Sequence, residues 1–169
     1  MAEPTFDELL RASDREALHL EMRDGYSQKD PAFIAWQAGG QIDPVSYWPQ
    51  WYELLRPVAA RGVHVRRARI VSEPVSEYIR YEYDVTDGLN IAAGEQVRWL
   101  PRRRASDIAL PGNDFWLFDE RIAMLNHFSG DGESVGHEVT DDATLIGLCA
   151  SAFRAVWSRA TPHHDYRIA

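Results

Sequence analysis

The sequence has a single cysteine, a single lysine and no long apolar segment. One thiol, Cys149, can form neither an internal disulfide nor a cysteine cluster around a metal ion. No stretch approaches the roughly 18 apolar residues that cross a bilayer. Residues 1–10 also lack the basic start and apolar run of a secretory signal. These absences make a cytoplasmic protein the expectation.

Motifs of the common enzyme classes are also missing from the sequence. There is no Gly-rich phosphate loop, no HExxH, no GxSxG and no cysteine pairing of the kind that binds zinc. The 6 histidines are scattered along the chain. We therefore predict no metal site and no cofactor, and the sequence favours a protein that is not an enzyme.

The charge is acidic overall and uneven along the chain. A net charge of −8 disfavours non-specific binding to nucleic acid or to an anionic membrane. Residues 63–104 nevertheless carry 8 basic and 6 acidic side chains. This middle segment could serve an anionic ligand, although a solvated surface of arginines is the simpler interpretation.

The composition is that of one globular domain. The chain has 169 residues, of which 45% are hydrophobic and 26% are charged. The elements follow the order helix, strand, two helices, strand, helix, strand, hairpin, helix, which is typical of an α+β fold with a small mixed or antiparallel sheet. We predict one domain over residues 1–162 and a mobile tail over residues 163–169.

A hairpin at about residues 114–128 is the predicted centre of the fold. The apolar runs Phe115–Phe118 and Ile122–Leu125 are too short for helices and are separated by three charged residues, a hairpin length. Helices over residues 45–61, 74–85 and 141–160 should cover it. Residues 134–139 should form an edge strand.

Local signals place the remaining elements. Thr5 with Glu8 predicts a capping box, and Asp30 followed by Pro31 predicts a helix start. Ser72 and Thr140 are predicted to begin two later helices. Alternating polar and apolar residues over 17–26 predict a half-buried strand.

The predicted strand at residues 63–71 carries Arg67 and Arg69 on the same side as three valines. Either a bulge shifts the register, or two arginines point into an apolar layer and need partners. One interpretation is an internal network with Glu82, Asp114 or Asp119. The other is a pocket in which Arg67, Arg69 and Tyr78 hold a carboxylate or phosphate.

A second candidate site lies at the far end of the hairpin. His127 could act as an acid or base, with Asp131 as its acceptor, and Asn126 could contact a ligand. Strand alternation points Asn126 and His127 to opposite faces, however. Asp131 followed by Gly132 is also an ordinary turn signal.

Several segments together are familiar: GVHVRRARIVSEPVSEYIRYEY, GEQVRWLPR, NDFWLFDERIAMLNHFSGDG and the closing helix. From Phe6 to about Pro162 the chain resembles a family of actinobacterial proteins of unknown function, whose genes often lie near helix-turn-helix regulators. The resemblance implies a regulatory or partner-binding role, with a helix-turn-helix regulator or another protein as the partner.

The sequence has a looser resemblance to the phospholipase-D-like architecture. Those enzymes use the pattern HxK-x4-D, whereas His64-Val65-Arg66 and His127-Phe128-Ser129 both lack the lysine. Lys29 is the only lysine in the chain. The resemblance therefore implies a version of this architecture without the phosphodiesterase chemistry.

The sequence thus predicts a non-enzymatic, cytoplasmic regulatory or interaction domain. It would bind a protein partner or a small anionic ligand, without direct contact to nucleic acid or membrane. The alternative hypothesis is a small-molecule enzyme or biosynthetic tailoring protein that uses His127 as its acid or base.

Overall fold

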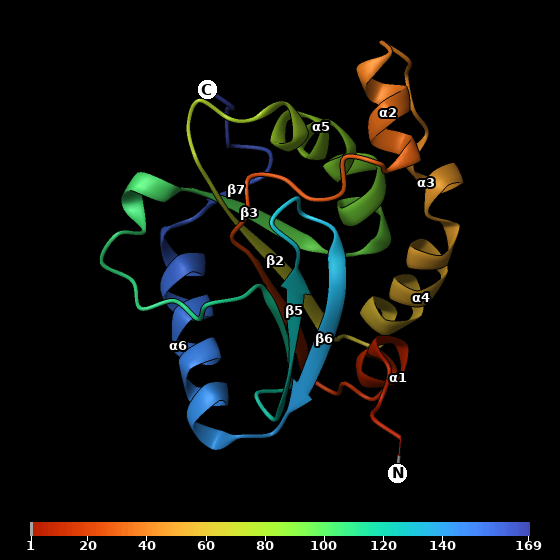
Figure 1. Ribbon diagram of the computed structural model, residues 1–169. Coiled ribbons are helices and arrows are strands. Elements are labelled where there is room, and N and C mark those ends of the chain that lie inside the picture. Colours follow the sequence, from red (N-terminus) through yellow and green to blue (C-terminus); the bar gives the residue numbers. More distant parts are fainter. Residues whose placement is uncertain (1) are drawn as a thin grey trace.

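A computed structural model describes residues 2–169 as one mixed sheet of seven strands with helices on both faces (Figure 1). The helices are α1 (Phe6–Arg11), α2 (Pro31–Gln37), α3 (Pro44–Tyr47), α4 (Pro49–Ala60), α5 (Glu77–Thr86) and α6 (Ala143–Arg159), with a π-helix at Asp87–Ile91 and a 3₁₀ helix at Arg102–Arg104. The strands are β1 (Glu16–Glu21), β2 (His64–Val71), β3 (Gln96–Pro101), β4 (Phe115–Phe118), β5 (Ile122–Phe128), β6 (Ser134–Thr140) and β7 (Thr161–Pro162).

The sheet has the strand order β6-β5-β4-β1-β2-β3-β7. Strands β1, β2 and β3 are parallel, while β4, β5 and β6 form an antiparallel meander that joins the sheet through β1. The predicted hairpin is confirmed as β4 and β5, with Phe118 paired to Ile122 across the turn. The α+β prediction is also confirmed, and β6 is an edge strand as expected.

One face of the sheet is apolar and is covered by α6, on the left in Figure 1. Leu20 on β1, Ile70 on β2 and Phe115 on β4 are fully buried there against Phe153 and Val156 of α6. Burying one such side chain contributes roughly 1.5–3 kcal/mol. This layer is therefore the main apolar core of the domain.

The opposite face is covered by α1, α4 and α5. Leu10, Leu55 and Val65 belong to one apolar cluster on this side, and Val71 and Ile79 belong to a second. Between these two clusters, the middle of the face is occupied by charged side chains from β1 and β2. This charged centre contains the candidate site described below.

Two helix starts follow the sequence prediction. Thr5 caps α1 in a capping box with Glu8, and the Asp30 side chain accepts a hydrogen bond from the Ala32 amide at the start of α2. Two other caps lie further along the chain than predicted. Ser76 caps α5 in place of Ser72, and Asp142 caps α6 in place of Thr140.

Three other elements differ from the sequence prediction. The helix predicted over residues 45–61 is divided at Trp48 into α3 and α4, because Pro49 has no amide hydrogen to continue the ladder. The chain continues through a π-helix after Thr86 instead of breaking there. Strand β1 is buried on both faces, since its polar residues His19 and Glu21 point into the protein.

The C-terminal segment predicted as a mobile tail is packed onto the domain. His163 and Tyr166 are buried, and the indole nitrogen of Trp99 donates a hydrogen bond to Nδ1 of His163 at 3.0 Å. The Val75 amide donates to the carbonyl of Ala169 at 2.8 Å. Among residues 2–169, no helix has both the length and the apolar character needed to cross a bilayer.

Candidate functional site

Strand β2 pairs with β1 and β3 in regular register from Arg66 to Arg69. No bulge shifts its alternation, so Arg67 and Arg69 share a face with Val65 and Val71. Both guanidinium groups therefore point to the helix-covered side described above. Arg69 is only 4% exposed, and a charge so deeply buried needs partners in the protein.

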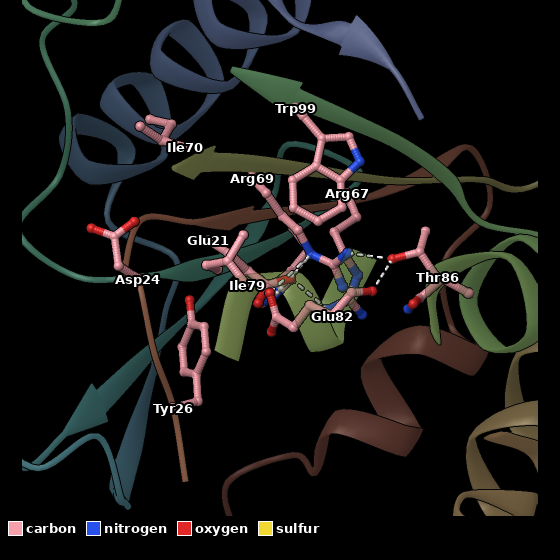
Figure 2. A network of polar contacts seen from close by, with 12 residues as sticks. Glu21, Asp24, Tyr26, Arg67, Arg69, Ile70, Ile79, Glu82, Thr86 and Trp99 are labelled. Atoms are coloured by element: carbon pink, nitrogen blue, oxygen red, sulfur yellow. Dashed lines mark hydrogen bonds and ion pairs between the residues drawn. The ribbon is translucent and has the colours of Figure 1, made fainter. Parts of the chain in front are cut away.

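Carboxylates from β1 and from the residue before β3 supply those partners. Arg67 donates from Nη1 to Glu21 Oε1 at 2.7 Å and from Nε to Glu95 Oε1 at 3.0 Å. Arg69 donates from Nε to Glu21 Oε1 at 3.2 Å and from Nη1 to Thr86 Oγ1 at 2.7 Å (Figure 2). The internal network expected from the sequence therefore exists.

Only one of the three partners predicted for these arginines belongs to the network. Glu82 Oε2 lies 3.6 Å from Arg69 Nε. Asp119 instead accepts hydrogen bonds from three consecutive backbone amides at residues 14–16. Asp114 accepts from the Met22 amide at 2.8 Å and from the Tyr26 hydroxyl. Both aspartates tie the hairpin to β1 and its flanking segments.

Aromatic rings enclose the two guanidinium groups. The Arg67 guanidinium lies 5.6 Å from the ring centre of Trp51 and 5.7 Å from that of Trp116. The Arg69 guanidinium lies 4.8 Å from the ring centre of Trp99, which Figure 2 shows beside it. Cation–π attraction of this kind offsets part of the cost of removing the charges from water.

A cavity of about 250 Å³ opens over the two arginines. It lies between β2, α4, α5 and the π-helix, with the following lining residues: Asp30, Trp48, Trp51, Arg67, Arg69, Tyr78, Tyr81, Glu82, Val85, Leu89 and Asn90. Small-molecule sites usually occupy ~300–1,000 Å³. The cavity therefore suits a small metabolite. Arg67, Arg69 and Tyr78, which the sequence grouped as one ligand site, all line it.

The π-helix supplies two of the lining residues, Leu89 and Asn90. Asn90 Nδ2 donates to Glu95 Oε2 at 2.5 Å, which fixes the carboxylate that in turn holds Arg67. Single π-helical turns inside α-helices are rare and often occur at functional sites. Here the wide turn connects the cavity wall to the charged network.

Both arginines and Glu82 have unused hydrogen-bonding capacity at the cavity. Within residues 2–169, neither Nη2 of Arg67 nor Nη2 of Arg69 donates a hydrogen bond, and the Glu82 carboxylate accepts none. None of these atoms is sealed from open space, unlike Nε1 of Trp51, which is buried without an acceptor. Asp30, the other carboxylate that lines the cavity, already accepts hydrogen bonds from the Ala32 amide and the Tyr81 hydroxyl, so Glu82 is the lining carboxylate with free acceptor capacity.

Burial and neighbouring charges separate the pKa values of the glutamates. Burial, reinforced by Glu21, raises the pKa of Glu82 to about 8. Burial also acts to raise the pKa of Glu21, but the charges of Arg67 and Arg69 outweigh it and hold that pKa below its usual range. With Glu82 protonated at neutral pH, the carboxylates of Glu21 and Glu95 balance the two guanidinium groups.

The second candidate group of the sequence is not brought together. His127 lies near the end of β5, and its Nε2 is 3.8 Å from Oε2 of the exposed Glu138, beyond hydrogen-bonding distance. Asn126 pairs with His137 on the edge strand. Asp131 lies in an exposed turn and borders a different, polar cavity with Arg23 and Arg102. No shared pocket joins Asn126, His127 and Asp131 in this structure.

Residues 2–169 contain no group of three or more His, Cys, Asp or Glu side chains arranged to hold a metal ion. Asp87 lies between two histidines, with its Oδ2 3.7 Å from His163 Nε2 and its Oδ1 3.5 Å from His164 Nε2. Because Nδ1 of His163 accepts the Trp99 proton, Nε2 carries the hydrogen in the neutral ring and donates toward Asp87. That tautomer leaves no lone pair on Nε2 for a metal.

Comparison with known proteins shows to which family the chain belongs. A model described as a domain of unknown function, DUF6879, matches residues 4–168. The chain belongs to this family. No curated protein sequence matches it.

Two solved structures are similar in fold. One is the phospholipase D family member Nuc from Salmonella typhimurium, with 10% identity, a TM-score of 0.52 and coverage of 95% of this chain and 88% of that chain. The other is TrmBL2, an archaeal chromatin protein described with a novel mode of DNA binding. It has 12% identity, a TM-score of 0.49 and coverage of 91% of this chain and 47% of that chain. The likeness to Nuc confirms a phospholipase-D-like fold.

Sequence reasoning missed Glu21, Glu95, Thr86 and Trp51 as parts of the site. Glu21 occupies a polar position of an alternating strand, a pattern that normally indicates exposure to solvent. Glu95 and Thr86 flank a segment that was expected to be loop. The available signal was the pair of arginines itself, because buried cations require buried carboxylates, and Glu21 lies on the predicted strand that precedes theirs in the sequence.

Proposed function

We propose that this protein is a non-enzymatic regulatory domain that binds a small ligand through an anionic group. The ligand would lie in the cavity over Arg67 and Arg69. The observation that carries the proposal is that Arg67 and Arg69 line a cavity of about 250 Å³ and that the Nη2 group of each has no acceptor within residues 2–169. A carboxylate or phosphate oxygen is the acceptor that guanidinium groups bind best.

The surrounding contacts support this proposal. Glu21 and Glu95 hold Arg67 at two positions, and Glu21 and Thr86 hold Arg69 at two positions. Because these contacts fix the guanidinium groups before binding, a ligand loses little free energy in ordering them. The walls of Trp48, Trp51, Tyr78 and Tyr81 offer apolar surface to the body of the ligand.

The proposal of a role without catalysis rests on the chemistry of the side chains. The HxK-x4-D pattern of the phospholipase-D-like enzymes is absent, and Lys29, the single lysine, precedes α2 instead of lying on a central strand. His127, the residue of the alternative enzyme hypothesis, is about two-fifths exposed and has no carboxylate within hydrogen-bonding distance in the described chain. No observation favours the enzyme over the binding domain.

The test is a binding screen with small carboxylates and phosphates, read as the rise in melting temperature and confirmed by calorimetry. Arg69→Lys keeps the charge but removes the forked donor, so we expect affinity to fall by about tenfold or more. Arg66→Lys, on the same strand but on its opposite face, is the matched control and should bind as the wild type does. If no small anion raises the melting temperature of the wild type, the proposal fails.

We propose further that the ligand signal passes to a protein partner, a helix-turn-helix regulator encoded nearby. The support is the resemblance to actinobacterial proteins with such neighbours, together with the net charge of −8, which suits a basic partner. The measurement is binding of the purified neighbouring regulator at low and high salt. Absence of a complex at low salt would contradict this part of the proposal.

A further inference from the structure

Glu82 is the feature that the anion-binding proposal leaves unexplained. It is 92% buried on α5, since only 8% of its surface is exposed, and it lines the same cavity as the two arginines. Its carboxylate accepts no hydrogen bond from residues 2–169, and its contact to Arg69 Nε is at 3.6 Å. Burying a carboxyl group without a hydrogen bond costs free energy, and a ligand that supplies a donor to Glu82 would recover part of that cost.

The neighbours of Glu82 explain why the arginines do not satisfy it. Arg69 Nε directs its hydrogen bond to Glu21 Oε1 at 3.2 Å, and Arg69 Nη1 donates to Thr86 at 2.7 Å. Both arginines together face three buried carboxylates: Glu21, Glu82 and Glu95. The network therefore has one carboxyl group more than it has cations, and Glu82 is the one that lacks a donor. A cationic group placed beside Glu82 would lower its pKa and favour its ionised form.

The cavity thus has two poles of opposite character. The Nη2 groups of Arg67 and Arg69 are donors without an acceptor among residues 2–169, whereas the Glu82 carboxyl group is an acceptor without a donor. We infer that the ligand carries an ammonium group as well as a carboxylate, as a free amino acid does. Its carboxylate lies on Arg67 and Arg69, and its ammonium lies on Glu82. This inference rests on the proposed function, because it names the ligand class of the same site.

The walls of the cavity favour an amino acid with an apolar side chain. Trp48, Trp51, Tyr78 and Tyr81 contribute four aromatic rings, and Val85 and Leu89 contribute aliphatic surface. A volume of about 250 Å³ limits the ligand to a single small molecule and leaves little room for a peptide. Aromatic faces also attract an ammonium group that lies over them.

The experiment compares amino acids with analogues that lack either the ammonium group or the carboxylate group. L-leucine and L-phenylalanine carry both groups, isocaproate and hydrocinnamate lack the ammonium, and leucinamide and phenylalaninamide lack the carboxylate. Calorimetric titration of the full chain with each probe gives their relative affinities. We expect each single-pole probe to bind about tenfold or more weakly than its parent amino acid, since each loses a charged hydrogen bond.

Glu82→Gln and Glu77→Gln form the matched pair of variants. Both lie on α5, but Glu77 is exposed and outside the cavity. Glu82→Gln should lose the preference for L-leucine over isocaproate while still binding isocaproate. Glu77→Gln should keep the wild-type preference. Melting temperatures of both variants establish that they are folded.

The outcomes separate this inference from the proposed function. If isocaproate binds the wild type as tightly as L-leucine does, the inference is overturned and the anion-binding function remains. If Glu82→Gln keeps the full preference for L-leucine, the ammonium is not on Glu82 and the inference is likewise overturned. If none of the carboxylate-bearing probes nor inorganic phosphate binds, both the inference and the proposed function fail.

Discussion

The two faces of the central sheet are buried in different ways. Ile70 and Arg69 are neighbours on β2, and Ile70 packs into an apolar cluster under α6, whereas Arg69 enters a network of carboxylates under α5. Apolar packing is non-directional and tolerates small changes in shape. A buried ionic network requires each group to have its partner. The apolar face therefore tolerates small substitutions, whereas the charged face depends on each of its partners and is where a binding function can be located.

The largest expected effect comes from removing the carboxylate that both arginines share. Glu21→Ala leaves Arg67 and Arg69 buried without their common acceptor. We expect unfolding free energy to fall by ~3–5 kcal/mol, the usual cost of breaking a buried ion pair. Chemical denaturation measures it, and Glu53→Ala on the exposed side of α4 is the control. A loss of less than about 1 kcal/mol would mean that the network does not stabilise the fold.

A smaller loss is expected on the apolar face. Ile70→Val removes one methylene from a fully buried side chain and should cost ~0.5–1.5 kcal/mol. The same denaturation experiment applies. If Ile70→Val destabilised the protein as much as Glu21→Ala does, the apolar face would not be the more tolerant of the two to substitution.

The charged face should also show a pH dependence that the apolar face lacks. The folded pKa of Glu82 is raised from 4.5 to about 8 by burial. The stability that protonated Glu82 contributes is fully present below its unfolded pKa of about 4.5. This stability is lost as the pH rises to the folded pKa. Glutamine does not titrate, so Glu82→Gln should gain stability relative to the wild type as pH rises from about 5 to about 8.

Melting temperatures of the two proteins across that pH range check this prediction. The difference between them should be flat above the folded pKa, because Glu82 is then ionised in both the folded and the unfolded states. Asp114, whose pKa burial raises to about 6, interacts with Glu82 through its charge, so part of the difference between the proteins near that pH reflects this interaction. A constant difference at every pH would show that Glu82 does not have a raised pKa.

The smallest effect is expected at the edge of the sheet, away from both faces. Val135 on β6 is 64% exposed, so Val135→Thr should change the unfolding free energy by no more than about 0.5 kcal/mol. The binding of small carboxylates should be unchanged. A large effect on either quantity would indicate that the edge strand is coupled to the cavity.

Much of the fold could be predicted from local patterns. The apolar runs of the hairpin, the cap at Thr5 and the proline after Asp30 each act over a few residues, and all three are present in the structure. Boundaries that depend on tertiary packing were less predictable. Alternation in β1 indicated a half-buried strand because His19 and Glu21 are polar, although both face a buried charged centre.

The site could be predicted only in part for a related reason. Alternation in β2 placed Arg67 and Arg69 on an apolar face, which required partners but did not identify them. Glu82 was one of the partners predicted, whereas Glu21 on β1 and Glu95 just before β3 reach the arginines through a strand order that cannot be read from sequence. The cluster at Asn126, His127 and Asp131 was close in sequence, but strand geometry separates its side chains.

The most direct test of the central claim is a nuclear magnetic resonance titration of the arginine Nε–H groups with a small carboxylate. The account predicts that the resonances of Arg67 and Arg69 shift along one saturable curve, while that of Arg80, exposed on α5, stays in place. Unchanged Arg67 and Arg69 resonances, or equal non-saturating shifts of all arginines, would contradict a ligand site over these two residues.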